Sequence, residues 1–209
     1  RVAGVCHEAG VPLVLNAAYT AGVMPVDGRE LGVDVLVSSG HKSWASSGPV
    51  GILALADEVA EHVLARSKRF PNKELYLLGC PVLGAALATL MASFPHVVER
   101  VKRWPEEVEK ARWLVEQLER IEGVRQLGVR PKEHVLICFE TPGFHEVARR
   151  HRRRGFFLYE ELKKHGIVGI QPGLTRRIKL STYGLTREEL ERVARAFHEI
   201  AVKYGLKVR

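Results

Sequence analysis

The sequence predicts an α/β fold with a mainly parallel sheet, followed by a smaller α/β domain. Short apolar runs at 11–15 and 33–37 alternate with helical patterns, which is typical of βαβ units and parallel sheets. The 209 residues, 46% of them hydrophobic, are enough for a substantial core. We expect residues 1–94 to be the C-terminal part of a large domain, and 95–209 to be a connecting helix and a small C-terminal domain.

The first region begins with a helical pattern at 2–9, and its two apolar runs read as strands. The segment 48–55 starts with a Gly-Pro turn and continues as a strand, antiparallel to its neighbour if only a loop joins them. A helix is expected at 57–66.

The middle of the chain predicts two helices. The segment 81–93 is small and apolar on nearly every face, as in a buried helix. A charged helix is expected from 95 to 121, with Pro105 marking a kink or a restart.

The last third predicts a small α/β domain that ends in a helix. Thr186 is a good N-cap for that helix, and Glu189 three residues later completes a capping box. The other expected elements are strands at 124–128, 134–140, 167–170 and 177–181, a turn at 141–143, and a basic helix at 144–165 interrupted near Gly155.

Composition limits the class of protein. The chain has no run of about 18 uncharged apolar residues and no signal peptide at its start, so we expect a cytoplasmic protein with no membrane partner. Its three cysteines have no metal-ligand spacing, which argues against a disulfide framework or a zinc site. The chain opens on Arg1 without an initiator methionine, and we expect it to be the C-terminal portion of a longer protein.

Positive charge is in excess. The formal net charge is +8, which suits a polyanionic partner without identifying one. The densest cluster is the run 149–154, which contains five arginines and one histidine. Two interpretations stay open for this run, a solvated helix face and a contact with a phosphate backbone.

Polar residues follow the two apolar strands of the first region. Asn16 ends one run, and Ser39-Gly40-His41-Lys42 closes the other. Ligands of parallel sheets bind beyond the carboxyl ends of the strands. A lysine there, with a hydroxyl and an imidazole beside it, suits a nucleophilic amine close to a bound phosphate. The segment therefore predicts a lysine that holds pyridoxal 5'-phosphate (PLP) as a Schiff base.

These motifs resemble those of fold type I PLP enzymes, and within them those of the archaeal O-phosphoseryl-tRNA:cysteinyl-tRNA synthases. The resemblance covers essentially the whole chain. The segments that carry it are Leu15-Asn16-Ala17-Ala18-Tyr19-Thr20, Met24-Pro25-Val26, Gly40-His41-Lys42-Ser43, Gly48-Pro49-Val50-Gly51, 90–101 and 179–185.

The resemblance implies a role for each residue of the PLP signature. Lys42 would carry the cofactor and then remove the α-proton of the substrate. Ser39 and His41 would bind the cofactor phosphate, and the turn at Gly40 would let the backbone approach it. Asn16 would face the pyridine nitrogen, where the broader fold type usually places an aspartate, so the ring should be a weaker electron sink.

Two further site residues are implied less directly. Tyr19 stands where related enzymes often bind the ring oxygen of the cofactor. Cys80 corresponds to a cysteine that the family uses in sulfur transfer, and a thiolate at a helix N-terminus could carry a persulfide. A buried structural role for Cys80 stays open. Cys6 and Cys138 lie in apolar patterns and are expected in the core.

The resemblance implies conversion of O-phosphoseryl-tRNA(Cys) to cysteinyl-tRNA(Cys), a PLP-dependent transferase reaction of tRNA-dependent cysteine biosynthesis. It also implies a homodimer, a sulfur donor and a complex with O-phosphoseryl-tRNA synthetase. Two alternatives stay open, an enzyme like cysteine desulfurase or selenocysteine lyase, and a non-catalytic RNA-binding module with a vestigial lysine. Family members carry an N-terminal half that supplies further site residues, so we expect these 209 residues alone to be inactive.

Overall fold

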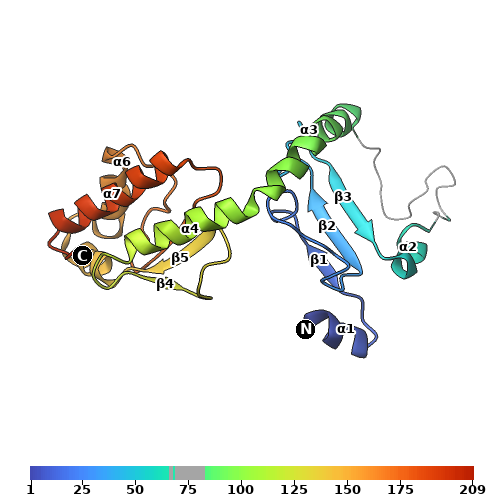
Figure 1. The fold of residues 1–209 in the computed structure, drawn as a ribbon, viewed down its shortest axis with the longest axis horizontal. Coiled ribbons are helices and arrows are strands. Elements are labelled where there is room, and N and C mark those ends of the chain that lie inside the picture. Colours follow the sequence, from blue (N-terminus) through green and yellow to red (C-terminus); the bar gives the residue numbers. More distant parts are fainter. Residues whose placement is uncertain (66–67, 69–82) are drawn as a thin grey trace. The chain divides into compact units, whose positions relative to one another are not determined.

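The computed structural model describes residues 1–65, 68 and 83–209, and the chain divides into two compact units, Arg1–Trp104 and Pro105–Arg209 (Figure 1). The domain boundary expected at 94/95 lies ten residues before this division, inside a continuous helix. We describe each unit by itself.

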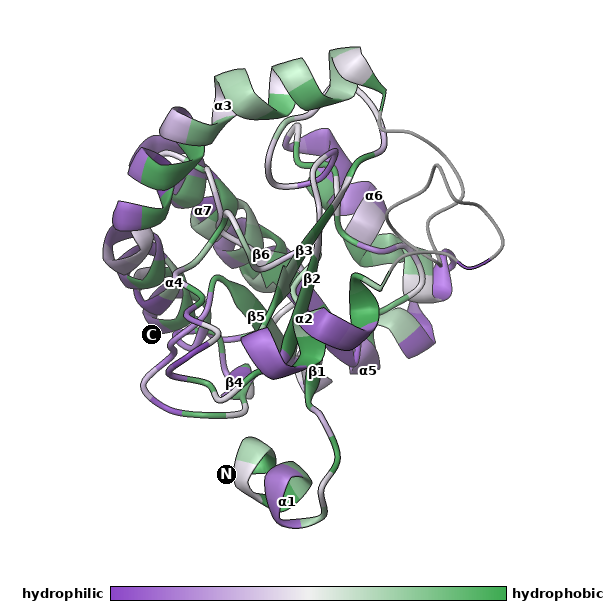
Figure 2. Cartoon of the chain, turned by 90° about the vertical axis from the view of Figure 1, so that its right-hand side faces the viewer, coloured by the Kyte–Doolittle hydropathy of each residue, from purple (hydrophilic) through white to green (hydrophobic). Residues whose placement is uncertain are grey.

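Unit 1, Arg1–Trp104, contains a three-stranded mixed sheet in the order β1-β2-β3. Strand β1 (Val14–Asn16) runs parallel to β2 (Val35–Ser39), and Asn16 lies opposite Val37. Strand β3 (Gly51–Leu55) is antiparallel to β2, as predicted. Figure 2 shows that β2 and β3 are largely hydrophobic. Both β1 and β2 extend farther toward the polar signature than expected, so Asn16 and Ser39 are the last residues of their strands.

Three helices complete the described part of unit 1: α1 (Val2–Glu8), α2 (Asp57–Val63) and α3 (Gly84–Lys102). Helix α3 crosses the end of the sheet at which β1 and β2 terminate (Figure 1). Asp34, just before β2, accepts hydrogen bonds from the backbone N–H of Leu13 at 2.6 Å and from the His7 ring at 2.9 Å. The bond from Leu13, followed by that from His7, lowers the pKa of Asp34.

Helix α3 corrects the expected break at Pro95. The helix continues through Pro95 to Lys102, and the break comes at Arg103, before α4 (Trp104–Leu118). Proline removes one backbone hydrogen bond from a helix interior. Contacts on both sides of Pro95 hold α3 against the loops that follow β1 and β2, because Ser93 donates to the Trp44 carbonyl and Arg100 donates to the Gly22 carbonyl. Tertiary contacts therefore outweigh the local signal of a helix end.

Unit 2, Pro105–Arg209, is built on an antiparallel sheet in the order β4-β5-β6, formed by Arg125–Leu127, Leu136–Glu140 and Arg177–Ser181. Side chains alternate between its faces, so Ile137, Phe139 and Ile178 are buried while Lys179 is exposed. The other elements after α4 are α5 (Pro142–Arg150), a 3₁₀ turn at Arg154–Phe156, α6 (Phe157–Lys164) and α7 (Arg187–Lys203).

One contiguous core holds unit 2 together. The sheet's inner side chains pack with Leu114, Phe144, Phe157 and Phe197, all of them at most 1% exposed. The predicted capping box at α7 is confirmed, since Thr186 accepts from the Glu189 N–H at 3.2 Å and Glu189 accepts from the Thr186 N–H at 2.8 Å.

The interruption expected near Gly155 in the basic helix at 144–165 is present, because α5 ends at Arg150 and α6 begins at Phe157. Two other expectations for unit 2 are wrong. The turn expected at 141–143 is the start of α5, where Pro142 occupies a first-turn position that needs no N–H donor. The strand expected at 167–170 is irregular backbone, with Gly169 at φ 110°.

In the described residues, no helix is long and apolar enough to cross a membrane.

Candidate functional site

Parallel pairing of β1 and β2 brings the two polar segments of the predicted site to one edge of the sheet. The pairing continues past the strand end, because the Ala17 N–H donates to the Val37 carbonyl at 2.8 Å. Asn16 and the turn 40–44 therefore leave the sheet side by side, as the strand-end argument predicted.

A buried serine fixes this edge. Ser38 is 6% exposed, and its hydroxyl donates to the Ala17 carbonyl at 3.3 Å. The same hydroxyl accepts from the indole N–H of Trp44 at 3.2 Å. Successive strand residues point to opposite faces, so Ser39 is directed away from this network and is half-buried.

Lys42 lies in the turn after β2 with its amine over the ring of Tyr19, 4.0 Å from the ring centroid. Both residues are exposed, as is His41. A cation over an aromatic face is attracted by the ring quadrupole. The structure thus brings together two residues that stand 23 positions apart in the chain, both of them predicted for the site.

Asn16 is oriented by its own turn. Its Oδ1 accepts from the Ala18 N–H at 3.1 Å, a typical Asx turn. Because the backbone N–H can only donate, the atom facing it must be the amide oxygen. The Nδ2 group is therefore left as a donor at the end of β1.

Gly40 is required by packing inside the protein. A Cβ on this buried residue would lie 2.3 Å from Val50 Cγ1, which no real side chain could tolerate. Its N–H donates to the Val50 carbonyl at 2.8 Å, and its carbonyl accepts from the Ser46 N–H at 2.9 Å. Ala45 in the same loop has φ 56°, a strained conformation for a residue with a Cβ.

Arg100 of α3 ties together the two loops that carry Tyr19 and Lys42. Its Nε and Nη2 donate to the Gly22 carbonyl at 3.1 and 2.6 Å, and Nη2 also donates to the Ser43 carbonyl. Gly22 has φ 86°, and a Cβ there would lie 3.2 Å from Val97 of the same helix. The guanidinium thus joins both loops to α3 and to each other.

Other side chains extend this support along α3. The hydroxyl of Ser46 donates to the Ala86 carbonyl at 2.8 Å, and the hydroxyl of Ser93 donates to the Trp44 carbonyl. The rings of Trp44 and Phe94 stack with centroids 5.5 Å apart. The loop after Lys42 is therefore held on a helix rather than free in solvent.

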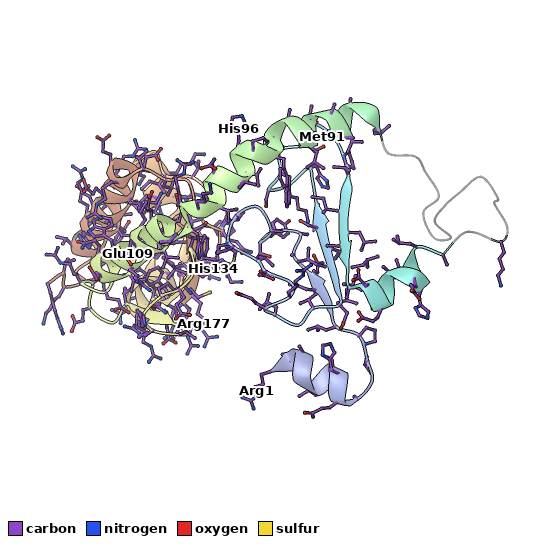
Figure 3. The ribbon with its side chains drawn as sticks, turned by 45° about the vertical axis from the view of Figure 1, so that its right-hand side comes forward. Arg1, Met91, His96, Glu109, His134 and Arg177 are labelled. Atoms are coloured by element: carbon purple, nitrogen blue, oxygen red, sulfur yellow. The ribbon has the colours of Figure 1, made fainter. Side chains whose placement is uncertain are left out.

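Sequence reasoning missed Arg100, although a signal for it exists. The side of α3 that faces the loops carries Ala86, Leu90, Ser93 and Val97 at helical spacing, and Arg100 continues this series. A lone arginine on the inward stripe of a helix needs internal acceptors, which the two loop carbonyls supply. Figure 3 marks Met91 and His96 on the same helix, and both are exposed.

The predictions for the three cysteines differ in how they compare with the structure. Cys80 lies outside the described residues. The expectation that Cys6 and Cys138 are core residues is wrong, because both are half-buried free thiols. Cys138 lies on the open face of its sheet opposite Lys179, where the alternation of side chains gives it only partial cover. No cluster of potential metal ligands occurs among the residues that the structure describes.

The groups at this edge are suited to PLP by their chemistry. An exposed lysine amine can form the Schiff base, a hydroxyl and an imidazole can bind a phosphate, and the Asn16 Nδ2 can donate to a ring nitrogen. The lysine stands in a turn that three separate contacts to α3 hold in place.

Comparison with known proteins places this arrangement in a family. The family described as "O-phosphoseryl-tRNA(Sec) selenium transferase, SepSecS" matches residues 1–202. The chain belongs to this family. Together with the curated Cys-tRNA synthases described next, this match confirms the resemblance drawn from the sequence motifs.

Curated relatives in the archaea are highly similar. The chain is 59% identical over 217 residues to "O-phospho-L-seryl-tRNA:Cys-tRNA synthase 2" of Archaeoglobus fulgidus, covering 100% of the chain and 56% of that protein. It is 58% identical to the synthase of Methanopyrus kandleri, covering 98% of the chain and 54% of that protein. The chain thus spans about half the length of the curated relatives it matches.

Solved structures agree with the predicted fold class. A SepCysS–SepCysE N-terminal domain complex matches with 52% identity and a TM-score of 0.87, over 97% of this chain and 54% of that one. A cysteine desulfurase of Thermococcus onnurineus NA1 matches with 19% identity and a TM-score of 0.65, over 97% of this chain and 55% of that one, which shows the fold alone. The chain has a mixed α/β architecture similar to that of fold type I PLP enzymes, and it spans about half of each matched chain.

Proposed function

We propose that the chain is the C-terminal half of a PLP-dependent enzyme that replaces the phosphate of tRNA-bound O-phosphoserine with sulfur. The product is cysteinyl-tRNA(Cys). The observation that carries this proposal is the position of Lys42, whose amine lies over the Tyr19 ring at the sheet edge where Asn16 ends β1. The chain that places these residues together is 59% identical to a Cys-tRNA synthase.

Sulfur rather than selenium is proposed on the strength of the relatives. The family description names a selenium transferase that acts on tRNA(Sec), whereas the relatives at 58–59% identity are named as Cys-tRNA synthases. A cysteine desulfurase function has weaker support, because the desulfurase neighbours share only 17–19% identity with the chain.

Each predicted site residue has a task in this proposal. When bound, PLP supplies an electron sink for the α-carbon of an amino-acid substrate. Lys42 would hold the cofactor through Nζ, and the same atom would accept the α-proton of the substrate. Ser39 and His41 bind the phosphate, and Gly40 keeps the turn between them tight. Tyr19 holds the amine of Lys42 over its ring.

Asn16 is proposed to donate Nδ2 to the ring nitrogen, since its Oδ1 is engaged by Ala18. An amide donor favours a ring nitrogen without a proton, in contrast to the charged partner that an aspartate would provide. A weaker electron sink suffices for a substrate whose β-phosphate leaves readily. Cys80 is proposed as a persulfide carrier whose terminal sulfur would add to the β-carbon, after which an external thiol reductant would cleave the resulting S–S bond to release the cysteinyl product and the free Cys80 thiol.

We also propose the wider arrangement of the protein. Residues 1–94 would belong to the PLP-binding domain and 95–209 to the connecting helix and small domain. The intact enzyme would be a homodimer that takes sulfur from a donor and docks with O-phosphoseryl-tRNA synthetase. The 52% identical relative assembles with a SepCysE N-terminal domain, which supports a protein partner for this chain as well.

The test uses the full-length protein with PLP, O-phosphoseryl-tRNA(Cys) and sulfide. We expect a visible absorbance band that borohydride abolishes, and release of phosphate together with cysteinyl-tRNA. Lys42→Ala should lack both the band and turnover. Rapid sulfide release from free cysteine without tRNA would instead identify a desulfurase, and tRNA binding without the band would identify a non-catalytic RNA-binding module.

A further inference from the structure

The arginine run 149–154 is divided between a helix end and a fixed loop. Helix α5 ends at Arg150, and Arg152 and Arg154 follow it in the loop that leads to α6. The solvated helix face that the sequence allowed is therefore absent for the second half of the run. All five arginines of the run are exposed.

Neighbouring carboxylates neutralise only two of these arginines. Arg149 Nη1 lies 3.3 Å from Glu146, and Arg153 Nε lies 3.2 Å from Glu160. In the described part of the chain, Arg150, Arg152 and Arg154 form no ion pair and no side-chain hydrogen bond. Three guanidinium groups therefore present their full charge and all of their donors to solvent.

His151 anchors the segment between α5 and α6 that carries Arg152 and Arg154. Nδ1 of His151 accepts from the Arg153 N–H at 3.1 Å, which leaves Nε2 to meet the Tyr204 hydroxyl at 3.4 Å. The His151 ring packs against Phe157, with centroids 5.5 Å apart, and edge-on against Tyr204 at 5.7 Å. A half-buried ring thus holds the middle of the basic run in place.

Backbone strain and close packing fix the far end of the loop. Arg154 has φ 47°, which is uncommon for a residue with a side chain. The next residue, Gly155, packs against the backbone of Gly173. A Cβ atom on Gly155 would lie 2.6 Å from the Gly173 carbonyl oxygen. Such strain persists where the surroundings determine the conformation, and it concentrates at functional sites.

The same loop borders a hollow of about 440 Å³ on unit 2. Arg150 and His151 line it, together with Val147, Tyr204 and Leu206. The surface is therefore hollowed beside Arg150, and the lining also includes Glu146, whose carboxylate pairs with Arg149. We define this arginine surface as Arg150, Arg152 and Arg154.

We propose that the arginine surface binds the sugar-phosphate backbone of the RNA that carries the substrate. Three unpaired arginines, one at the end of α5 and two in the fixed segment that follows it, complement the negative charge of a phosphate backbone, and each guanidinium can give two parallel hydrogen bonds to one phosphate. A loop that is already ordered loses little conformational entropy on binding. This inference rests on the proposed function, because it takes tRNA as the substrate.

The experiment compares tRNA(Cys) binding by the full-length protein across salt concentrations. The test variant is Arg150→Gln/Arg152→Gln/Arg154→Asn, in which asparagine tolerates the positive φ. The matched control is Lys163→Gln/Arg192→Gln/Arg195→Gln, which removes three charges from exposed side chains of α6 and α7. Circular dichroism establishes that both variants are folded, and Arg152→Gln alone serves as a milder second variant.

The expected result is a loss of about 10- to 100-fold in affinity for the test variant at 150 mM salt, and little change for the control. The slope of log K against log salt should become shallower by about 2 to 3 for the triple variant and by about 1 for Arg152→Gln. Unchanged affinity and slope in the test variant, or an equal loss in the control, would overturn the proposal.

Turnover of the wild type separates this proposal from the proposed function. If the wild type converts O-phosphoseryl-tRNA while the test variant binds tRNA as tightly as the wild type, the function stands and the arginine surface is wrong. If the wild type binds no tRNA at low salt, both proposals fail together.

Discussion

Single side chains, in addition to the pairing of β1 with β2, join the two loops that carry Tyr19 and Lys42. The Arg100 guanidinium donates to two loop carbonyls, and the Ser38 hydroxyl donates to the Ala17 carbonyl at the end of β1. A buried or half-buried carbonyl that loses its donor costs about 1–3 kcal/mol. The position of Lys42 therefore depends on residues that would never contact the cofactor.

Replacing Arg100 with methionine should loosen the site. Met keeps an apolar stem but leaves the Gly22 and Ser43 carbonyls unpaired, so we expect unit 1 to lose about 2 kcal/mol of stability. We also expect the full-length protein to bind PLP about tenfold more weakly, because Lys42 and Tyr19 are no longer held together. PLP titration followed by absorbance, with hydrogen exchange of the loops 17–24 and 40–46, measures both effects.

Arg103→Met is the matched control for this experiment. Arg103 is exposed at the end of α3, and its side chain makes no hydrogen bond in the described part of the chain. Equal losses of PLP affinity in the two variants would show that Arg100 has no special role.

The carboxylate of Glu161 offers a pH test in unit 2. Glu161 is 5% exposed, and burial alone would raise its pKa, but Lys164 and Lys203, each 2.5 Å away, outweigh burial and lower the pKa to about 2. The folded-state pKa lies below the unfolded value. The interaction of the Glu161 carboxylate with these two lysines therefore stabilises the fold above pH 4.5, and this stability is lost as the pH falls toward 2.

We expect Glu161→Gln to lower the free energy of unfolding by about 2 kcal/mol at pH 7. This value is smaller than the full pKa shift implies, because solvent screens the charges of the two exposed lysines. The difference from wild type should shrink between pH 4.5 and pH 2. Urea unfolding at a series of pH values measures it. Glu116→Gln, at an exposed position of α4 that forms no ion pair with any described residue, should leave the free energy of unfolding nearly unchanged. A difference that stays constant down to pH 2 would contradict this assignment.

At the scale of elements, the capping box shows how a local signal sets a helix start. Both of its hydrogen bonds are present at Thr186 and Glu189, and the hydrogen bond from the Thr186 N–H is the first cause of the lowered pKa of Glu189. Thr186→Ala should destabilise unit 2 by about 1 kcal/mol. Thermal unfolding measures the shift. Ser181→Ala, an exposed hydroxyl at the end of β6, is expected to change the melting temperature little, and a similar shift in both variants would argue against the cap.

Elements with a local signal could be predicted from the sequence, and those decided by distant contacts could not. Thr186 marks its own helix, and the apolar runs before Asn16 and Lys42 mark their strands. Pro95 signals a helix end, yet Ser93 and Arg100 bind carbonyls more than 40 residues away and keep α3 continuous. The partners of Arg100 likewise depend on the fold, so spacing alone could not identify them.

At the scale of the whole chain, the two units differ in how they bury apolar surface. Among the described residues of unit 1, the buried hydrophobic residues are Ala17, Ala21, Ala86, Val97 and Trp104. Unit 2 instead buries several phenylalanines and a large set of Leu and Ile side chains in one core. Helix α3 exposes an apolar row in unit 1, formed by Leu83, Leu87, Met91, Phe94 and Val98. Burial of apolar surface is the dominant favourable term in folding, so the units should differ in stability.

The 209-residue chain by itself is therefore expected to be inactive, and for a physical reason that can be measured. Hydrogen exchange should be slow in β5 and α7 of unit 2 and fast in β1, β2 and α3 of unit 1, because unit 1 has little core of its own. A lysine on a fluctuating edge would not hold PLP, so the absorbance band and turnover should both be weak. Extending the chain to the length of its relatives should protect unit 1 and restore the band. Equal protection of both units in the 209-residue chain, or full turnover by it, would show that unit 1 needs no further residues to build the site.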